Sequence, residues 1–245
     1  MKETSLNFSF EIATFDFFCY KRSMIKDLEK LFTAAADPKI ALKQSAYMRN
    51  LFPYLGLPKP QREIIEKEIF KKTKVQNLAS LQKTLLDLWK QEPREFQYTA
   101  LCFAEKHRKI MTPAILPTLE TMIRNKSWWD TVDTIAPNLV GHLVKIHPEL
   151  SRVMDQWIED PYLWIRRAAL LHQLRWKEAT NAEKLFGYCQ KTLHEKDFFI
   201  RKAIGWVLRE YSKTNPKAVK KFISSHQSLL SNLSIREGSK YLDNF

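Results

Sequence analysis

The sequence predicts an all-α protein, and three observations support that fold class. Glycine occurs 5 times in 245 residues while hydrophobic residues make up 44%, a composition that disfavours a turn-rich β architecture. A short motif led by an aromatic residue recurs at offsets of 33 and 35 residues. Prolines also stand at or near the starts of segments with helical spacing, where the missing N–H costs little; these are Pro93, Pro113, Pro148, Pro161 and Pro216.

Start and stop signals bound the expected helices. A helix over residues 23–35 ends before Asp37–Pro38, because the residue before a proline disfavours helical backbone. Pro60 opens a helix over residues 61–70, since proline suits the first helical turn. The other expected helices cover residues 40–52, 78–90, 93–107, 113–125, 127–145, 149–158, 160–175, 181–193, 196–212, 216–225 and 234–243.

The chain is expected to form one domain over residues 21–245, preceded by an extension over residues 1–20. The extension is too apolar to stay in solvent, so we expect it to pack on the body of the protein. Its acidic residues Glu11 and Asp16 make it a poor signal peptide. No apolar run approaches the ~20 residues of a membrane span. The apolar side chains of the extension are Phe8, Phe10, Phe15, Phe17 and Phe18.

The cysteines indicate a reducing compartment. Cys19, Cys102 and Cys189 are odd in number, far apart and without Cys-x-x-Cys or Cys/His spacing. We therefore expect buried apolar thiols in the cytoplasm, and neither a disulfide framework nor a metal site.

The charge balance points to a polyanionic partner. Lys and Arg number 40 against 27 Asp and Glu, which gives a formal net charge of +13. Nucleic acid is the simplest such partner, although charge alone does not separate DNA from RNA or from a membrane surface.

The recurring motif predicts helix pairs stacked as a solenoid of the HEAT kind. Phe96–Ala100, Trp129–Asp133, Trp164–Ala168 and Phe199–Ala203 follow one another at offsets of 33, 35 and 35 residues. A period in that range, with two helices per unit, is typical of α-solenoids in which each pair buries its apolar face against its neighbours. Three units end the motif on alanine, whereas the second ends on the carboxylate of Asp133.

The later units become basic, which predicts a cationic concave groove. In such a solenoid the second helix of each pair is expected to line the concave surface. A curved groove of this charge suits the phosphate backbone of a duplex. The expected basic stripe consists of Arg166, Arg167, Arg201, Lys202 and Arg209.

The segment KSWWDTVD, which ends at Asp133, is the most unusual in the chain. Ser127 and Asp130 have the spacing of a capping box at a helix start. Asp133 follows Trp129 by four residues, so the two side chains share a helix face, and together they suit a positively charged group. Trp128 points about 100 degrees away and is expected in the core.

Each candidate also has a purely structural interpretation. Asp133 could be satisfied by a neighbouring arginine or a backbone N–H, since buried charges are usually paired. Trp129 and Trp206 could belong to the core, although Trp206 lies on the basic stripe. The alternative for Arg167 is a solvated surface position, and for Tyr47 it is the core.

Motifs of other enzyme classes are missing. The sequence has no GxSxG, no phosphate-binding glycine-rich loop and no Cys/His nucleophile pattern, which leaves hydrolase, kinase and dehydrogenase interpretations without residues. The histidines show no ligand spacing and no HExxH occurs. We therefore expect neither a metal nor a cofactor.

Five blocks of the sequence resemble the AlkD branch of the bacterial DNA alkylation-repair glycosylases. The most specific are Lys126–Asp133, with its tryptophan-aspartate motif, and Lys202–Tyr211, with its glycine-tryptophan motif. The resemblance covers about residues 22–243 in order, and the extension over residues 1–20 falls outside it. The other three blocks are Tyr47–Asn50, Tyr54–Arg62 and Arg167–Ala169.

The resemblance implies a HEAT-like fold and monofunctional removal of N3- and N7-alkylated purines from duplex DNA. The catalytic aspartate of the family falls on Asp133, its two groove tryptophans on Trp129 and Trp206, its phosphate-contacting arginine on Arg167 and a further active-site tyrosine on Tyr47. It also implies that the lesion is handled from the backbone side without base extrusion. We expect a monomer that acts on nucleoid DNA in the bacterial cytoplasm.

The chemistry of these residues agrees with the resemblance. Alkylation at N3 or N7 makes the purine cationic, so it departs as a neutral base without a general acid. One carboxylate can stabilise the positive sugar and orient a water, and tryptophan faces add cation–π attraction of ~0.5–2 kcal/mol each.

Two other interpretations of the chain stay open. The first is a non-catalytic repeat module that binds DNA structure or a protein, which an Asp133 locked beneath the surface with a basic neighbour would favour. The second is an RNA-binding repeat protein, which would need base-reading side chains in every unit.

Overall fold

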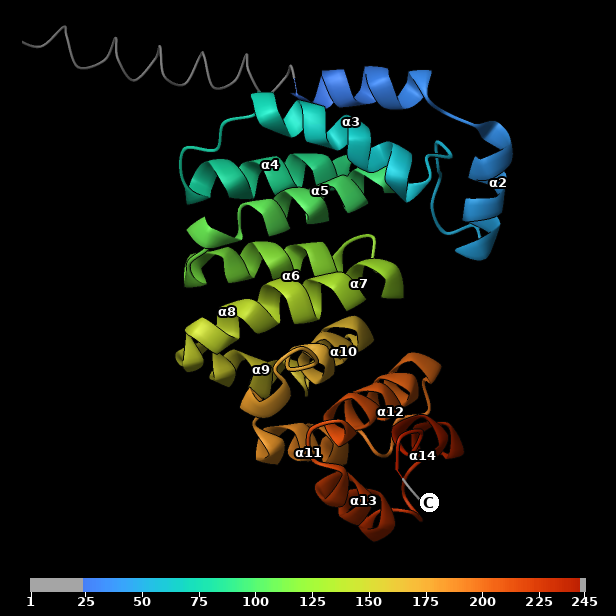
Figure 1. Ribbon diagram of the computed structural model, residues 1–245, viewed down its shortest axis with the longest axis vertical. Helices are drawn as coiled ribbons and strands as arrows, with labels where there is room; N and C mark the ends of the chain where they lie inside the picture. Colours follow the sequence, from blue (N-terminus) through green and yellow to red (C-terminus); the bar gives the residue numbers. More distant parts are fainter. Residues whose placement is uncertain (1–23, 243–245) are drawn as a thin grey trace, which may run out of the picture. The chain divides into compact units, whose positions relative to one another are not determined.

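The computed structural model describes residues 24–242, and the regular structure within that range is helical throughout (Figure 1). The fold class is therefore the all-α helical-repeat class that the sequence predicts. The chain divides into two compact units, with the boundary between His107 and Arg108. The phenylalanine-rich extension over residues 1–20 lies outside the described residues, and the single domain over residues 21–245 stays a prediction.

The described part of the first unit is a stack of helices around an apolar core. In α4, Leu81, Leu85 and Leu88 recur at helical spacing and are fully buried, as expected for a helix that faces a core. α4 and α5 lie side by side (Figure 1). The helices of this unit span residues 24–34, Pro38–Tyr47 (α2), Lys59–Lys72 (α3), Leu78–Lys90 (α4) and Arg94–Lys106 (α5).

One carboxylate fixes the loop between α2 and α3. Glu95 on α5 accepts hydrogen bonds through Oε1 from the N–H groups of Leu55, Gly56 and Leu57, at 3.0, 2.9 and 3.2 Å. Gly56 has a φ of 89°, and a Cβ there would lie 2.0 Å from the carbonyl oxygen of Asp37. Only glycine fits this turn, because other residues are strained at positive φ and would also clash.

The second unit continues the pattern of short helices joined by tight turns. Its helices are Leu116–Arg124 (α6), Trp129–Ile135 (α7), Gly141–Ile146 (α8), Ser151–Trp157 (α9), Leu163–Leu171 (α10), Ala182–Lys191 (α11), Phe198–Ser212 (α12), Pro216–Ser225 (α13) and Asn232–Gly238 (α14). Short 3-10 turns occupy Arg108–Ile110, Pro113–Ile115, Pro148–Leu150 and Lys177–Ala179.

The helix expected over residues 127–145 is interrupted in the structure. α7 is followed by a π-helical segment, Ala136–Val140, in which the N–H of Gly141 bonds to the carbonyl of Ala136 five residues earlier. Pro137 explains the interruption, because it cannot donate to the carbonyl four residues back and its ring crowds that carbonyl. That carbonyl belongs to Asp133.

The capping box expected at Ser127 and Asp130 is wrong. Trp128 is the N-cap of α7 and makes no side-chain capping bond. The Ser127 hydroxyl instead donates to the Ile123 carbonyl and accepts a bond from the Tyr162 hydroxyl at 2.8 Å. The sequence therefore has the spacing of a capping box, but the Ser127 hydroxyl bonds to Ile123 and Tyr162 and does not cap the helix.

The repeat pattern is visible in how its positions are buried. Ala100, Ala168 and Ala203, which end the motif in three units, are fully buried. Asp133 holds the equivalent place in α7, and its side chain is 15% exposed. Within the second unit, α10 packs against both α7 and α12. This contact brings three motif-bearing helices together.

Candidate active site

A pocket of about 320 Å³ lies where α7, α10 and α12 come together. Its wall combines four aromatic rings, three cations and one carboxylate. The lining residues are Trp129, Asp133, Arg167, Phe198, Phe199, Lys202, Trp206 and Arg209. The sequence predicted six of these residues as site residues, and the structure brings those six into one cavity.

α7 supplies the tryptophan and the acid. Trp129 opens the helix and Asp133 follows one turn later, so both side chains project from the same face, as their spacing predicts. Both line the pocket. The structure therefore places Trp129 at the pocket and not in the core, which was its alternative interpretation. Trp206 also lines the pocket.

Asp133 is held by a two-pronged ion pair with Arg167. Arg167 Nε donates to Asp133 Oδ1 and Nη2 donates to Oδ2, each at 2.8 Å. The remaining Nη1 donates to the Phe199 carbonyl. Because a guanidinium and a carboxylate match in this geometry, the pair fixes the carboxylate plane as well as its charge.

The electrostatics of Asp133 are set by burial and by two charged neighbours. Burial raises the pKa of its carboxyl above the ordinary value, the hydrogen bonds and charge of Arg167 lower it, and the charge of Asp130 raises it. The net direction is upward. An acid in this state is a better proton acceptor than a solvated aspartate, because its conjugate acid is weaker.

Although it is paired with Arg167, Asp133 stays accessible to a ligand in the pocket. The Arg167 side chain is 3% exposed, but Asp133 is 15% exposed and lines the cavity. A carboxylate has about four acceptor positions, and Arg167 uses two of them. Asp133 can therefore accept further bonds from a water or a ligand in the pocket.

The neighbouring aromatic side chains form a supporting cluster. Trp128 packs against Trp164 and Phe199, with ring centroids 5.5 and 5.0 Å apart. Asp197 caps α12 by accepting the N–H groups of Phe199 and Ile200 at 2.7 and 3.3 Å. Trp128 packs in this cluster but is only partly buried, and its extended backbone at the N-cap of α7 places it outside the helix from which its direction was predicted.

The expected basic stripe is divided in the structure. Arg167, Lys202 and Arg209 line the pocket, whereas Arg166 and Arg201 do not. Those two arginines bind the Glu195 segment: Arg166 Nε lies 2.7 Å from the Glu195 carboxylate, and Arg201 Nε donates to the Glu195 carbonyl at 2.8 Å. Arg166 and Arg201 therefore lie outside the pocket, and a stripe of five cations along a concave surface stays a prediction.

Arg167 is also not the solvated surface residue of its alternative interpretation. It is buried at 3% exposure, and three of its nitrogens bond to acceptors within the protein. The resemblance assigned this arginine to a DNA phosphate. In the structure its immediate partner is the carboxylate, and contact with a phosphate stays a proposal.

Comparison with known proteins places this geometry in a family. Residues 28–242 match the family described as DNA alkylation repair enzyme. The chain belongs to this family. A solved structure described as a predicted DNA alkylation repair enzyme from Enterococcus faecalis is 34% identical, with a TM-score of 0.80, and the match covers 86% of this chain and 98% of that one.

More distant structures share the fold. AlkD2 and the smu.31 protein, both from Streptococcus mutans, are each 18% identical to this chain with TM-scores of 0.58. Each match covers 73% of this chain, with 88% of AlkD2 and 91% of smu.31. The chain matches no curated protein.

The alkylation-repair resemblance also singled out Tyr47, which lies in the first unit. Tyr47 ends α2 and is 73% exposed, so the core position of its alternative interpretation is wrong. The pocket residues all belong to the second unit. A role for Tyr47 on DNA stays a prediction.

Two pocket residues of this alkylation-repair protein were not predicted as site residues, namely Phe198 and Phe199. Phe198 is 56% exposed although it is a large apolar side chain. The sequence does contain a signal for them: the aromatic doublet at 198–199 repeats the doublet at 128–129 two motif periods later. Trp129 lines the pocket while Trp128 packs in the supporting cluster, whereas both Phe198 and Phe199 line the pocket and Phe199 also packs in that cluster.

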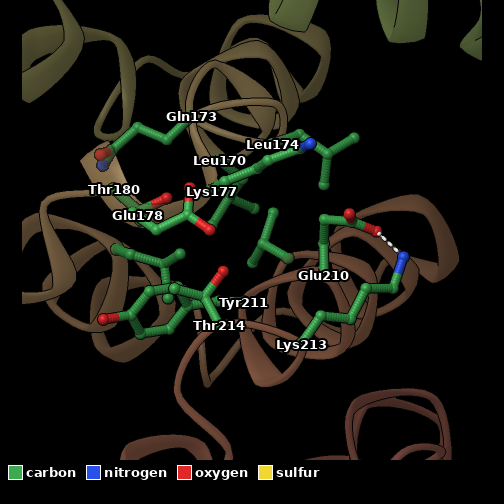
Figure 2. A pocket seen from close by; sticks show the side chains of 12 residues that line it. Leu170, Gln173, Leu174, Lys177, Glu178, Thr180, Glu210, Tyr211, Lys213 and Thr214 are labelled. Carbon is green, nitrogen blue, oxygen red and sulfur yellow. Dashed lines mark hydrogen bonds and ion pairs between the residues drawn. The ribbon is translucent and has the colours of Figure 1, made fainter.

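A second pocket, of about 280 Å³, lies between α10 and α12 (Figure 2). Its charged lining consists of Lys177, Glu178, Glu210 and Lys213, and Lys213 donates to Glu210 at 2.6 Å. The two cations and two carboxylates balance. This pocket therefore offers a phosphate no net positive charge, unlike the pocket at Asp133.

The two thiols within residues 24–242 are not activated as nucleophiles. Burial raises the pKa of Cys189, and burial near Glu66 raises that of Cys102 to about 11; Cys19 lies outside the described residues. No three His, Cys, Asp or Glu side chains in this range gather as a metal site requires. None of its helices is both long and apolar enough to cross a membrane.

Proposed function

We propose that this alkylation-repair protein is a monofunctional DNA glycosylase. It excises cationic N3- and N7-alkylated purines from duplex DNA by hydrolysing the N-glycosidic bond. It acts as a monomer in the bacterial cytoplasm and needs no metal or cofactor. The observation that carries the proposal is Asp133, a carboxylate fixed by Arg167 on a pocket wall that also holds Trp129 and Trp206.

The chemistry asked of Asp133 is electrostatic. As the C1′–N bond of an alkylated nucleotide breaks, its electron pair moves onto the purine, which leaves neutral, and the deoxyribose becomes positive. A fixed carboxylate stabilises that charge because its orientation is set before the reaction. A water bound by Asp133 then adds to C1′ and gives up a proton, which a carboxylate of raised pKa is suited to accept.

The lining of the pocket favours approach by the sugar and the backbone over insertion of the base. A flipped base is normally read by hydrogen bonds to its Watson–Crick edge, but the lining has no Asn, Gln, Ser or Thr side chain. Lys202 and Arg209 would also repel a cationic purine. These features support excision without base flipping, in which the indole rings of Trp129 and Trp206 flank the sugar.

The decisive experiment compares the wild-type protein with Asp133→Asn on methylated duplex DNA. We expect the wild-type protein to release free 7-methylguanine, measured by chromatography and mass spectrometry under single-turnover conditions. Asp133→Asn should lower the rate at least about 100-fold, the usual loss when an electrostatic stabiliser is removed. It should leave affinity for the duplex within a few-fold, because the amide keeps the shape of the carboxylate.

Asp130→Asn is the matched control. It makes the same chemical change one turn earlier on α7, at a residue that does not line the pocket, so excision should persist. A wild-type protein that binds duplex DNA but releases no base would support the non-catalytic repeat module instead. Near-normal excision by Asp133→Asn would remove this aspartate from the mechanism.

A further inference from the structure

Glu237 on α14 bridges two of the cations that line the pocket. Its Oε1 lies 2.6 Å from Lys202 Nζ, and its Oε2 bonds to Arg209 Nη1. Lys202 and Arg209 are seven residues apart on α12, two turns along one face, and Trp206 lies between them. One carboxylate therefore holds a cation on each side of a pocket tryptophan.

The close contact between α12 and α14 brings Glu237 to this place. A Cβ on Gly205 would lie 2.5 Å from the Cβ of Glu237 and 3.1 Å from the Ser234 carbonyl oxygen. Glycine at this position lets the two helices approach. Ser234 adds a bond across the contact, since its hydroxyl donates to the Arg201 carbonyl at 2.9 Å.

The bridge differs from the other ion pairs of α12. Lys213, the residue that follows α12, binds Glu210 three residues earlier, and neither residue lines the pocket at Asp133. Glu237 comes from another helix, and its side chain is 17% exposed, against 37% for Lys202 and 21% for Arg209. The bond from Lys202 and the charges of both cations lower the pKa of Glu237, so its carboxylate is ionised at neutral pH.

We propose that Lys202 and Arg209 form a binding site for one DNA phosphate, that Glu237 occupies this site in the free protein, and that the phosphate displaces it. The inference rests on the proposed function, because it takes duplex DNA as the ligand of the pocket. A carboxylate and a phosphate present similar oxygens to lysine and arginine. The arrangement that grips Glu237 is therefore one that suits a phosphate.

The exchange makes Glu237 a competitor of DNA. While Glu237 is bound, two cations face one anion and the cluster has a net charge of one. Without that carboxylate, both cations are available to the strand from the start, and no contact with Glu237 has to break before the phosphate binds. Glu237 consequently weakens binding to any duplex and limits retention on undamaged DNA.

The test measures affinity for an undamaged duplex as a function of salt for Glu237→Gln. The glutamine has almost the same size and cannot act as an anion. At about 0.1 M salt we expect binding roughly 3- to 10-fold tighter than wild type. The slope of log K against log salt should stay close to that of wild type, because the same phosphate is bound in both proteins. A slope steeper by about 0.9, the value for one additional phosphate contact, would mean that Glu237 keeps the phosphate out of the wild-type complex. Fluorescence anisotropy of a labelled duplex gives both quantities.

Two further variants separate this role from a general effect of charge. Glu210→Gln changes the net charge of the protein equally but frees only Lys213 outside the pocket at Asp133, so its affinity for the duplex should stay close to that of wild type. In a Lys202→Gln, Arg209→Gln background, Glu237→Gln should no longer tighten binding, because the phosphate site is gone.

The outcomes separate this inference from the glycosylase proposal. Binding by Glu237→Gln that is no tighter than that of Glu210→Gln, or a slope steeper than wild type by about 0.9, would overturn the exchange even if wild-type excision is normal. Tighter binding with an unchanged slope supports the phosphate site even if no base is released. A wild-type protein that binds no duplex DNA would overturn both proposals.

Discussion

Asp133 and Arg167 depend on each other within a wall that is largely closed to solvent. Taking two charges out of water is costly, and removal of one partner leaves the other without compensation, which costs about 3–5 kcal/mol. The pair also has a chemical consequence, because Arg167 lowers a pKa that burial raises. Arg167 therefore favours the ionised form of Asp133, against the effect of burial.

Arg167→Ala should move the pH dependence of excision. Without the guanidinium, burial dominates and the pKa of Asp133 rises further. Since excision requires the ionised carboxylate, the acid limb of the rate profile should shift to higher pH. Arg167→Lys keeps the positive charge but loses the two-pronged contact with Asp133, so it should shift the acid limb less. Single-turnover rates between about pH 5 and 9 measure both shifts.

Arg166→Ala is the natural control for that experiment, because Arg166 precedes Arg167 on α10 but binds Glu195 outside the pocket. Its acid limb should coincide with that of wild type. An unchanged limb in Arg167→Ala would mean that another group sets the pH dependence. A salt slope reduced by about 0.9 in Arg167→Ala would indicate a phosphate contact instead.

The sequence predicted those residues whose relation is set within one helix. Trp129 and Asp133 share a face because four residues make about one turn, and Trp206 follows Lys202 in the same way. Spacing within one helix could not identify Glu237 as a residue of the site. Its partners lie on another helix, and no spacing within α14 shows that Gly205 lets α12 approach it.

At the scale of elements, the start of α7 is fixed from α10. Lys126, which precedes α7, has a φ of 53°, a left-handed conformation that is unfavourable for residues other than glycine. The neighbouring Ser127 is held by the Tyr162 hydroxyl at 2.8 Å. The position of Trp129 and Asp133 therefore depends on a side chain from the next helix pair.

Tyr162→Phe should lower the free energy of unfolding by about 1 kcal/mol, the usual contribution of one such hydrogen bond. Because the bond joins two side chains, Tyr162→Phe and Ser127→Ala should be non-additive in a double-mutant cycle. Urea unfolding of the two single variants and the double variant measures the coupling. Strictly additive effects would show that the bond does not fix the start of α7.

Element boundaries show what sequence patterns can and cannot give. The helix expected over residues 78–90 matches α4, because its apolar stripe and the Asn77 cap coincide. The helix expected over residues 127–145 was wrong in its middle, since Pro137 forces a π-helical turn. The helix expected over residues 234–243 begins earlier, at Asn232, because Ser231 caps α14.

At the scale of the whole molecule, the excess of positive charge favours DNA while the buried groups set stability. The formal charge of +13 strengthens attraction to a polyanion and leaves the folded chain with internal repulsion. Protonation of histidines on acidification increases both effects. A buried histidine that stays neutral in the folded protein lowers the free energy of unfolding further on acidification, in addition to this general charge repulsion.

His172 is that histidine. It is 1% exposed, its Nδ1 lies 2.6 Å from the Ala169 carbonyl oxygen, and its ring packs edge-on against Trp176. Burial lowers its pKa from the ordinary 6.5 to about 4. Between these values the unfolded chain binds the proton and the folded chain does not, so stability falls as the pH drops through this window.

The loss expected from His172 between pH 7 and pH 5 is about 2 kcal/mol. Urea unfolding of the full chain at both pH values measures it. His172→Gln should be less stable than wild type at pH 7, because it disturbs a buried site. It should lose less stability on acidification, because glutamine does not titrate. The partly buried His142, whose pKa is also lowered, titrates in both proteins and cancels in the comparison. Equal losses in wild type and His172→Gln would mean that His172 is protonated in the folded state as readily as in the unfolded one, against its burial between Ala169 and Trp176.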